Sequence, residues 1–144
     1  MPQEILPIVD DKGRVIGQAS RGELHRSPGL LHPVVHLHVI SPDGEVFLQR
    51  RSEHKDTFPG YWDTAVGGHL GLGEDVLEGL RREALEEIGL KGFEPTALGI
   101  RRVDTPCESE LIYSFLTVSA GPFCLDPAEI ADGRFWNPAE IEAS

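Results

Sequence analysis

The sequence of 144 residues has few cysteines and no long apolar run. Its two cysteines, Cys107 and Cys124, stand far apart and without metal-ligand spacing, so we expect two free core thiols in a reducing compartment. No N-terminal stretch has the pattern of a signal peptide, and none approaches the roughly 20 apolar residues that cross a membrane. These absences favour a soluble cytoplasmic protein without a membrane partner.

Positive charge is also scarce. The chain has 13 Lys and Arg against 24 Asp and Glu, for a net charge of −11. This balance disfavours binding to a nucleic acid polymer or an anionic membrane. An anionic phosphate substrate would therefore need a metal ion or a local basic patch to hold it. The length and the 40% hydrophobic content suit one globular domain, which we expect to span residues 1–144.

Apolar periodicity divides the chain into short strands and one clear helix. Alternation around residues 5–9 resumes at 15–16 after a turn, which predicts a hairpin. The strands PVVHLHVI and EVFLQRR predict a second hairpin around the turn SPDG. The other expected elements are a loop or short helical turn over 21–32, strands near 64–67, 97–103, 111–118 and 134–136, and a short final helix from 137–138. The result is an α/β domain with a mixed sheet.

Residues 74–88 have helical periodicity, with Gly89 as the C-terminal cap. The apolar stripe comprises Val76, Leu77, Leu80, Ala84 and Ile88. Glu83, Glu86 and Glu87 share one face, which the spacing predicts to lie opposite that stripe. Such a cluster is commonly a solvated acidic surface. However, three converging carboxylates also suit Mg²⁺, which prefers oxygen ligands.

The segment GHLGLGEDVLEGLRREALEEIGL, residues 68–90, distinguishes these alternatives. It resembles the Nudix box, G-x5-E-x7-R-E-U-x-E-E-x-G-U, in which U is aliphatic. The matching positions are Gly68, Glu74, Arg82, Glu83, Ala84, Glu86, Glu87, Gly89 and Leu90. This resemblance to the MutT-like Nudix hydrolases implies an α/β/α sandwich. It also implies hydrolysis of a diphosphate linkage in a small molecule, expected to be a nucleotide or another organic diphosphate.

The resemblance assigns a metal site. It implies that Glu83, Glu87 and Glu86 bind Mg²⁺, for which Mn²⁺ would be the substitute, and that the carbonyl of Gly67 or Gly68 is a further ligand. The metal would neutralise charge on the diphosphate and lower the pKa of the attacking water.

The resemblance also assigns supporting and catalytic roles. Arg82 would orient a glutamate by salt bridging, and Glu74 would support the site from the start of the helix. We expect Glu83 to be the general base, with Glu129 on a late loop as the second candidate.

Residues 29–70 are similar to the Nudix branch that includes isopentenyl diphosphate isomerase. That similarity implies a second metal site at His25, His32, His69, Glu108 and Glu110. Glu108 and Glu110 stand two apart on an expected strand and would share a face. The alternative is that these histidines are structural or solvated. If the five side chains converge, we expect them to be an inherited scaffold that holds the loops together.

Gly67 argues against isomerase activity. The isomerases require a cysteine immediately before the glycine-histidine pair, and this chain has Gly67 there. The isomerases also have an eroded Nudix box, whereas this box is intact. The sequence therefore favours a hydrolase. A catalytically inert nucleotide-binding Nudix module remains the second hypothesis, and an isomerase the third.

One basic cluster follows the second hairpin. It contains Arg50, Arg51 and Lys55, of which Arg51 and Lys55 match diphosphate-binding positions of the isomerases. A strongly acidic protein that holds a diphosphate needs such a patch. The alternative is a solvated strand end.

Overall fold

The computed structural model describes residues 4–26, 29–53, 60–106, 108–128 and 130–143, without the side chains of residues 25, 26, 142 and 143. Nine strands and three helices lie within these residues. In chain order they are β1 (Ile5–Val9), β2 (Val15–Ser20), α1 (Arg21–Arg26), β3 (Leu31–Ile40), β4 (Val46–Arg51), β5 (Trp62–Thr64), β6 (Val66–His69), α2 (Val76–Ile88), β7 (Thr96–Asp104), β8 (Ser109–Val118), β9 (Ile130–Trp136) and α3 (Pro138–Ala143).

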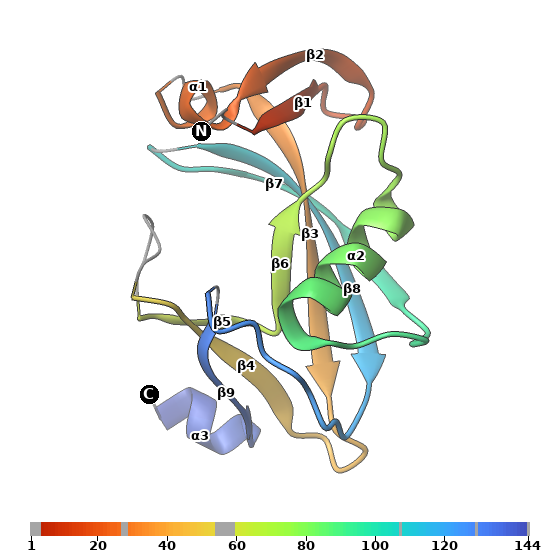
Figure 1. The fold of residues 1–144 in the computed structure, drawn as a ribbon, viewed down its shortest axis with the longest axis vertical. Coiled ribbons are helices and arrows are strands. Elements are labelled where there is room, and N and C mark those ends of the chain that lie inside the picture. Colours follow the sequence, from red (N-terminus) through yellow and green to blue (C-terminus); the bar gives the residue numbers. More distant parts are fainter. Residues whose placement is uncertain (1–3, 27–28, 54–59, 107, 129, 144) are drawn as a thin grey trace.

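The strands form two sheets (Figure 1). β1 and β2 make a separate antiparallel hairpin at one end of the molecule. The other seven strands form a mixed sheet in the order β5-β4-β3-β8-β7, in which β6 also pairs with β3 and β9 with β4. β3 runs parallel to β8 and antiparallel to β4 and β6. The predicted α/β fold with a mixed sheet is therefore confirmed, as are both predicted hairpins.

Helix α1, six residues long, lies in the segment for which the sequence predicted a loop or a short helical turn, and so agrees with the second of these alternatives. A capping box begins it: the backbone N–H of Glu23 donates to Oγ of Ser20 at 3.2 Å, and that of Ser20 donates to Oε1 of Glu23 at 3.1 Å. The S-x-x-E spacing of Ser20 and Glu23 is the sequence signal that would have predicted this helix. Its effect is to fix Arg21 at the first helical position, directly after β2.

Helix α2 begins at Val76, two residues later than predicted, because Asp75 is its N-cap. Oδ1 of Asp75 accepts a hydrogen bond of 2.8 Å from the backbone N–H of Glu78. The predicted Gly89 cap is confirmed, with a left-handed φ of 69°. α2 packs against β6 and β3, which places it on one face of the mixed sheet (Figure 1).

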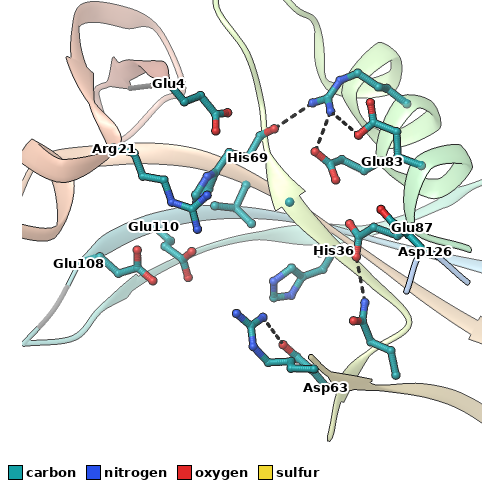
Figure 2. Close-up of a pocket in the computed structure, with 17 residues that line it drawn as sticks. Glu4, Arg21, His36, Asp63, His69, Glu83, Glu87, Glu108, Glu110 and Asp126 are labelled. Atoms are coloured by element: carbon teal, nitrogen blue, oxygen red, sulfur yellow. Dashed lines mark hydrogen bonds and ion pairs between the residues drawn. The ribbon is translucent and has the colours of Figure 1, made fainter. Parts of the chain in front are cut away.

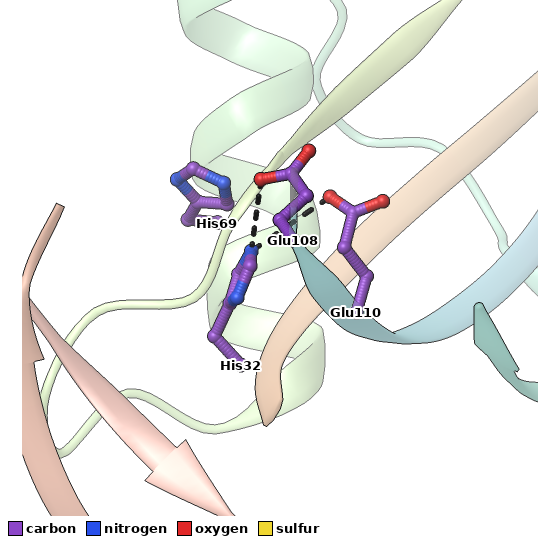
Figure 3. A group of neighbouring side chains, drawn as sticks. All are labelled: His32, His69, Glu108 and Glu110. Atoms are coloured by element: carbon purple, nitrogen blue, oxygen red, sulfur yellow. Dashed lines mark ion pairs between the residues drawn. The ribbon is translucent and has the colours of Figure 1, made fainter. Parts of the chain in front are cut away.

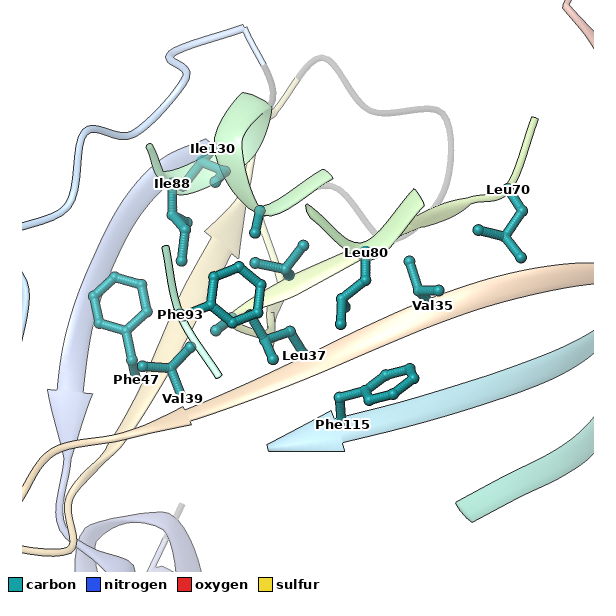
Figure 4. Packing of buried hydrophobic residues seen from close by; sticks show 13 residues of the cluster. Val35, Leu37, Val39, Phe47, Leu70, Leu80, Ile88, Phe93, Phe115 and Ile130 are labelled. Atoms are coloured by element: carbon teal, nitrogen blue, oxygen red, sulfur yellow. The ribbon is translucent and has the colours of Figure 1, made fainter. Parts of the chain in front are cut away.

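The main core lies between α2 and the sheet (Figure 4). From α2 it receives Leu80, Ala84 and Ile88, all fully buried, as predicted. Leu77 was predicted to join this stripe but is 48% exposed, because it lies at the edge of the apolar arc. The cluster consists of Val35, Leu37, Val39, Phe47, Ala65, Val66, Leu70, Leu80, Ala84, Ile88, Phe93, Phe115 and Ile130.

The C-terminal region includes the predicted final helix, α3. Asn137 caps it: its Oδ1 accepts from the backbone N–H of Glu140 at 2.8 Å. Cys124 is a free thiol but is exposed, so its predicted place in the core is wrong. Cys107 lies outside the described residues. Among the described helices, none is long and apolar enough to cross a membrane.

Candidate active site

A cavity of about 510 Å³ brings together side chains from both ends of the fold (Figure 2). α2, β6, β3, β4, β8 and the β1–β2 region all contribute to its wall. The lining residues are Glu4, Arg21, Val34, His36, Gln49, Arg51, Asp63, Gly67, Gly68, His69, Arg82, Glu83, Glu86, Glu87, Glu108, Glu110 and Asp126. Nearly all are polar or charged, so the cavity suits an anionic ligand only where arginines or metal ions offset the carboxylates.

Glu83 and Glu87 stand one helical turn apart on the cavity side of α2. A Cβ on Gly68 would collide with the Glu83 carboxyl, so the glycine permits this close approach. Glu87 is only 7% exposed, which corrects the prediction that all three glutamates lie opposite the apolar stripe. It follows Ala84 by three residues, so it lies at the buried edge of the helix. Burial and the adjacent Glu83 carboxyl raise the pKa of Glu87 to about 9.

Arg82 connects the other residues of the box. Its Nε donates to Oε2 of Glu74 at 2.7 Å, and its Nη1 donates to Oε1 of Glu83 at 2.8 Å. Nη2 donates to the His69 carbonyl at 3.0 Å. Hydrogen bonds from Arg82 lower the pKa of Glu74, and those to Glu74 raise the pKa of Arg82. Glu86, whose side chain is 56% exposed, is held less firmly by Arg82 at 3.2 Å.

A second cluster borders the same cavity, which three of its members, His69, Glu108 and Glu110, line (Figure 3). Ligating atoms of His32, His69, Glu108 and Glu110 all lie within 4.8 Å of one another. Nε2 of His32, which is 1% exposed, lies 3.7 Å from Glu108 Oε2 and 3.8 Å from Glu110 Oε2. Burial, with a contribution from Glu108, raises the pKa of Glu110 to about 7. Four of the five predicted positions therefore converge, and the His25 side chain lies outside the described residues.

Both clusters fit metal ions by their donor sets. Oε2 of Glu87 is buried with no hydrogen-bond partner among the described residues, and Glu83 lies beside it. A buried carboxylate is costly unless its charge is neutralised, either by a proton, which the raised pKa of Glu87 favours, or by a cation. The α2 carboxylates suit Mg²⁺ or Mn²⁺, whereas the two imidazoles with two carboxylates suit Zn²⁺ or Mn²⁺.

The two arginines of the predicted basic cluster, Arg50 and Arg51, lie on opposite faces of β4, because side chains alternate along a strand. Arg51 lines the cavity, with its Nη1 3.7 Å from Oδ2 of Asp63. Arg50 points to the other face of β4 and pairs with Glu53 at 3.4 Å, so the structure does not bring it to the cavity. Lys55 lies outside the described residues, as does Glu129.

The sequence did not identify seven cavity residues: Glu4, Arg21, Val34, His36, Gln49, Asp63 and Asp126. Gln49 stands two residues before Arg51 on β4, so alternation could have found it. The His36 imidazole lies across β6, where a Cβ on Gly67 would be 3.4 Å from Cδ2 of His36. Arg21 and Asp126 come from segments distant in sequence, so no local pattern indicated them.

Comparison with known proteins identifies the family. The model of the NUDIX domain matches residues 30–144, so the chain belongs to the Nudix family. It is an enzyme of the Nudix hydrolase class, acting on phosphorus-containing acid anhydrides.

Its relatives span both branches that the sequence suggested. A Nudix hydrolase of Yersinia pestis is 38% identical over 140 residues, covering 97% of this chain and 76% of the relative. An isopentenyl-diphosphate Delta-isomerase of Clavibacter sepedonicus is 31% identical over 150 residues, covering 98% and 78%. A crystal structure from Deinococcus radiodurans has a TM-score of 0.79 at 26% identity and covers 97% of this chain and 87% of that one.

Proposed function

We propose that this chain is a magnesium-dependent pyrophosphohydrolase. It would use water to cleave a diphosphate linkage in a nucleoside phosphate or a related organic diphosphate. The observation that carries the proposal is the shared cavity: the α2 carboxylates Glu83 and Glu87 face the same space as Arg51 and Arg21. Carboxylates that can hold a cation and arginines that can hold a phosphate therefore line one cavity and could act on one small molecule.

Four groups would hold the metal: the carboxylates of Glu83, Glu87 and Glu86 and the carbonyl of Gly68. Mg²⁺, or Mn²⁺ in its place, would supply a Lewis acid that offsets charge on the diphosphate and makes a water more acidic. The buried Glu87 oxygen without a partner supports this assignment, because a cation would compensate it.

Arginine side chains of this chain would bind and orient the substrate. Arg51 offers a planar guanidinium at the cavity wall, and such groups bind phosphate oxygens in pairs. Arg21, at the start of α1, also lines the cavity (Figure 2). Lys55, for which the sequence predicts the same role, follows Arg51 on the adjoining segment.

Glu83 is our candidate for the group that accepts the proton of the attacking water. Arg82 holds its Oε1 at 2.8 Å, which leaves the rest of the carboxylate for the cavity. Glu129 remains the second candidate from the sequence.

The His32 cluster has a separate role in this proposal. His32, His69, Glu108 and Glu110 would hold Zn²⁺ or Mn²⁺ as a scaffold that joins β3, β6 and β8. Its ligand set, with two imidazoles, differs from that of the α2 glutamates, so the two sites would prefer different ions.

Two other functions lead to different expectations. Isomerase activity is disfavoured because position 67 carries no thiol. An inert nucleotide-binding module would bind a diphosphate without turnover, and the intact set of box glutamates argues against it.

The test is a panel of nucleoside di- and triphosphates, nucleotide sugars, dinucleotides and isopentenyl diphosphate, each incubated with protein and Mg²⁺ and followed by ³¹P NMR. We expect metal-dependent release of phosphate or monophosphate from at least one compound, abolished by EDTA. Isopentenyl diphosphate converted to its isomer would support the isomerase. Saturable binding without turnover of any compound would support the inert module.

A further inference from the structure

The side-chain amide of Gln49 connects the sheet to the proposed metal site. Gln49 lies on β4 and is only 6% exposed. Its Nε2 donates two hydrogen bonds, one of 3.0 Å to the carbonyl oxygen of Ala65 and one of 2.9 Å to Oε1 of Glu87. Gln49 therefore bridges the β5–β6 connection and the buried carboxylate of α2.

The hydrogen-bonding partners of Gln49 determine which end of its side-chain amide faces Ala65 and Glu87. The Ala65 carbonyl can only accept a hydrogen bond, so the atom that contacts it must be the NH₂ group and not the amide oxygen. Both N–H groups of that nitrogen are then used, one for Ala65 and one for Glu87. Oε1 of Glu87 is thus held as an acceptor by a donor that has no other proton to offer.

The two oxygens of Glu87 consequently differ. Oε1 is held by Gln49, whereas Oε2 is buried without a hydrogen-bond partner among the described residues. A cation bound beside Glu83 would meet Oε2 as the available atom. For Oε1 to bind the same cation, the bond to Gln49 would have to break or lengthen.

We propose that Gln49 is a positioning residue that restricts Glu87 to one ligating oxygen and so makes the site prefer Mg²⁺ to Ca²⁺. Mg²⁺ requires near-octahedral geometry with single-oxygen ligands, whereas Ca²⁺ accepts carboxylates that bind through both oxygens. The inference rests on the proposed function, since it assumes that Glu87 binds the catalytic ion.

The test is Gln49→Met, which keeps the length of the side chain but removes the donor. The matched control is Thr117→Val. Thr117 is also buried and also donates to a backbone carbonyl, that of Glu94 at 3.1 Å, but it does not line the cavity. Both substitutions remove a buried hydrogen bond to the backbone, and only one of them frees Oε1 of Glu87.

Binding is measured without turnover. Free Mn²⁺ is followed by EPR, and Mg²⁺ or Ca²⁺ is titrated to displace the bound Mn²⁺. A parallel titration of Glu87→Gln identifies the fraction of Mn²⁺ that depends on Glu87. We expect Gln49→Met to lower the ratio of Mg²⁺ to Ca²⁺ affinity by about fivefold, the factor for one hydrogen bond of ordinary strength. Thr117→Val should leave the ratio unchanged.

The outcomes separate this inference from the proposed function. If wild type and Glu87→Gln bind Mn²⁺ equally, the proposed metal site is wrong and the inference falls with it. If wild type binds Mn²⁺ through Glu87 and hydrolyses a diphosphate, but Gln49→Met keeps the wild-type ratio, only the inference is overturned. Should Gln49→Met fail to fold, Gln49→Asn makes the same test, because its shorter amide cannot reach both acceptors.

Discussion

Nε of Arg82 donates a hydrogen bond of 2.7 Å to Oε2 of Glu74, eight residues earlier in the chain. The same guanidinium holds Glu83 at 2.8 Å and the carbonyl of His69 at 3.0 Å. One side chain thus joins the loop before α2, the end of β6 and a carboxylate on the cavity wall. The position of Glu83 therefore depends on a planar group with several donors.

Arg82→Lys tests that dependence. Lysine keeps the charge but has one nitrogen and cannot make the parallel bonds. We expect turnover to fall about tenfold or more, equivalent to ~1.4 kcal/mol of barrier, and the free energy of unfolding to fall by about 1–3 kcal/mol. The control is Arg81→Lys on the same helix, because Arg81 donates to the Phe93 carbonyl and does not line the cavity. Normal kinetics for Arg82→Lys would contradict the positioning role.

Glu83→Gln and Glu87→Gln should each lower turnover by about a hundredfold or more, since both remove a proposed metal ligand. The fold should survive, because loss of one negative charge relieves repulsion within the cluster. Glu78→Gln is the matched control, on the same helix but outside the cavity. Circular dichroism checks the fold, and steady-state kinetics check turnover. A folded Glu87→Gln enzyme with near-normal activity would refute the metal-site assignment.

Arg51→Ala should raise KM more than it lowers kcat, because a group that binds the diphosphate equally before and during reaction contributes to binding alone. Arg50→Ala supplies a control from the neighbouring position, since Arg50 faces away from the cavity. Added salt should weaken substrate capture by wild type more than by Arg51→Ala. Unchanged kinetics in the double variant Arg51→Ala/Lys55→Ala would support the alternative that this cluster is a solvated strand end.

His32→Ala should reduce thermal stability or metal content more than it reduces the Mg²⁺-dependent rate. Its imidazole is almost fully buried and faces Glu108 and Glu110, so its removal leaves both a void and two close carboxylates. Metal content is measured by mass spectrometry, stability by thermal unfolding, and the rate with saturating Mg²⁺. If the fold and metal content are intact but turnover is lost, the cluster is catalytic and not a scaffold.

His36 and His38 predict acid sensitivity of the metal-free protein. Burial lowers the pKa of both, against an opposing effect of Asp63. The unfolded chain takes up these protons near pH 6.5, whereas the folded protein resists them. The stability from neutral His36 and His38 is therefore present above that pH and is lost as pH falls, by at most ~1.4 kcal/mol per pH unit for each histidine.

The double variant His36→Gln/His38→Gln should lack this part of the pH dependence. Urea unfolding at pH 7.5 and at pH 5.5, with EDTA throughout, measures it by the change in unfolding free energy. Carboxylates also titrate in acid, so the comparison is between wild type and variant at each pH. Equal losses in both proteins would show that these imidazoles do not contribute.

Local sequence patterns predicted the elements that depend on short-range interactions, namely helix caps, turns and apolar stripes. The Gly89 cap of α2, the turn SPDG and the apolar residues Leu80, Ala84 and Ile88 all followed from spacing. Glu87 shows the limit of the pattern: a residue at the boundary of an apolar arc was assigned to the polar face by its charge, and the structure buries it. Which side a boundary residue takes depends on what packs against it, here Gln49 on β4.

The cavity required information that spacing does not contain. Arg21, Gln49 and Asp126 line the same cavity as Glu87, although they come from α1, from β4 and from the loop between β8 and β9. For the second cluster, the family resemblance named residues that no periodicity would have selected. Arg50 was predicted beside Arg51, and the alternation of β4 separates them.

The open backbone at Gly67 bears on how one chemistry could change into the other. A cysteine at this position would need only one substitution. Its Cβ would lie 3.4 Å from Cδ2 and 3.6 Å from Nε2 of His36, which is ordinary van der Waals contact. A cysteine side chain at position 67 would therefore stand beside the imidazole without a collision. The difference between glycine and cysteine at this position is thus one of chemistry and not of space, because the fold admits either residue.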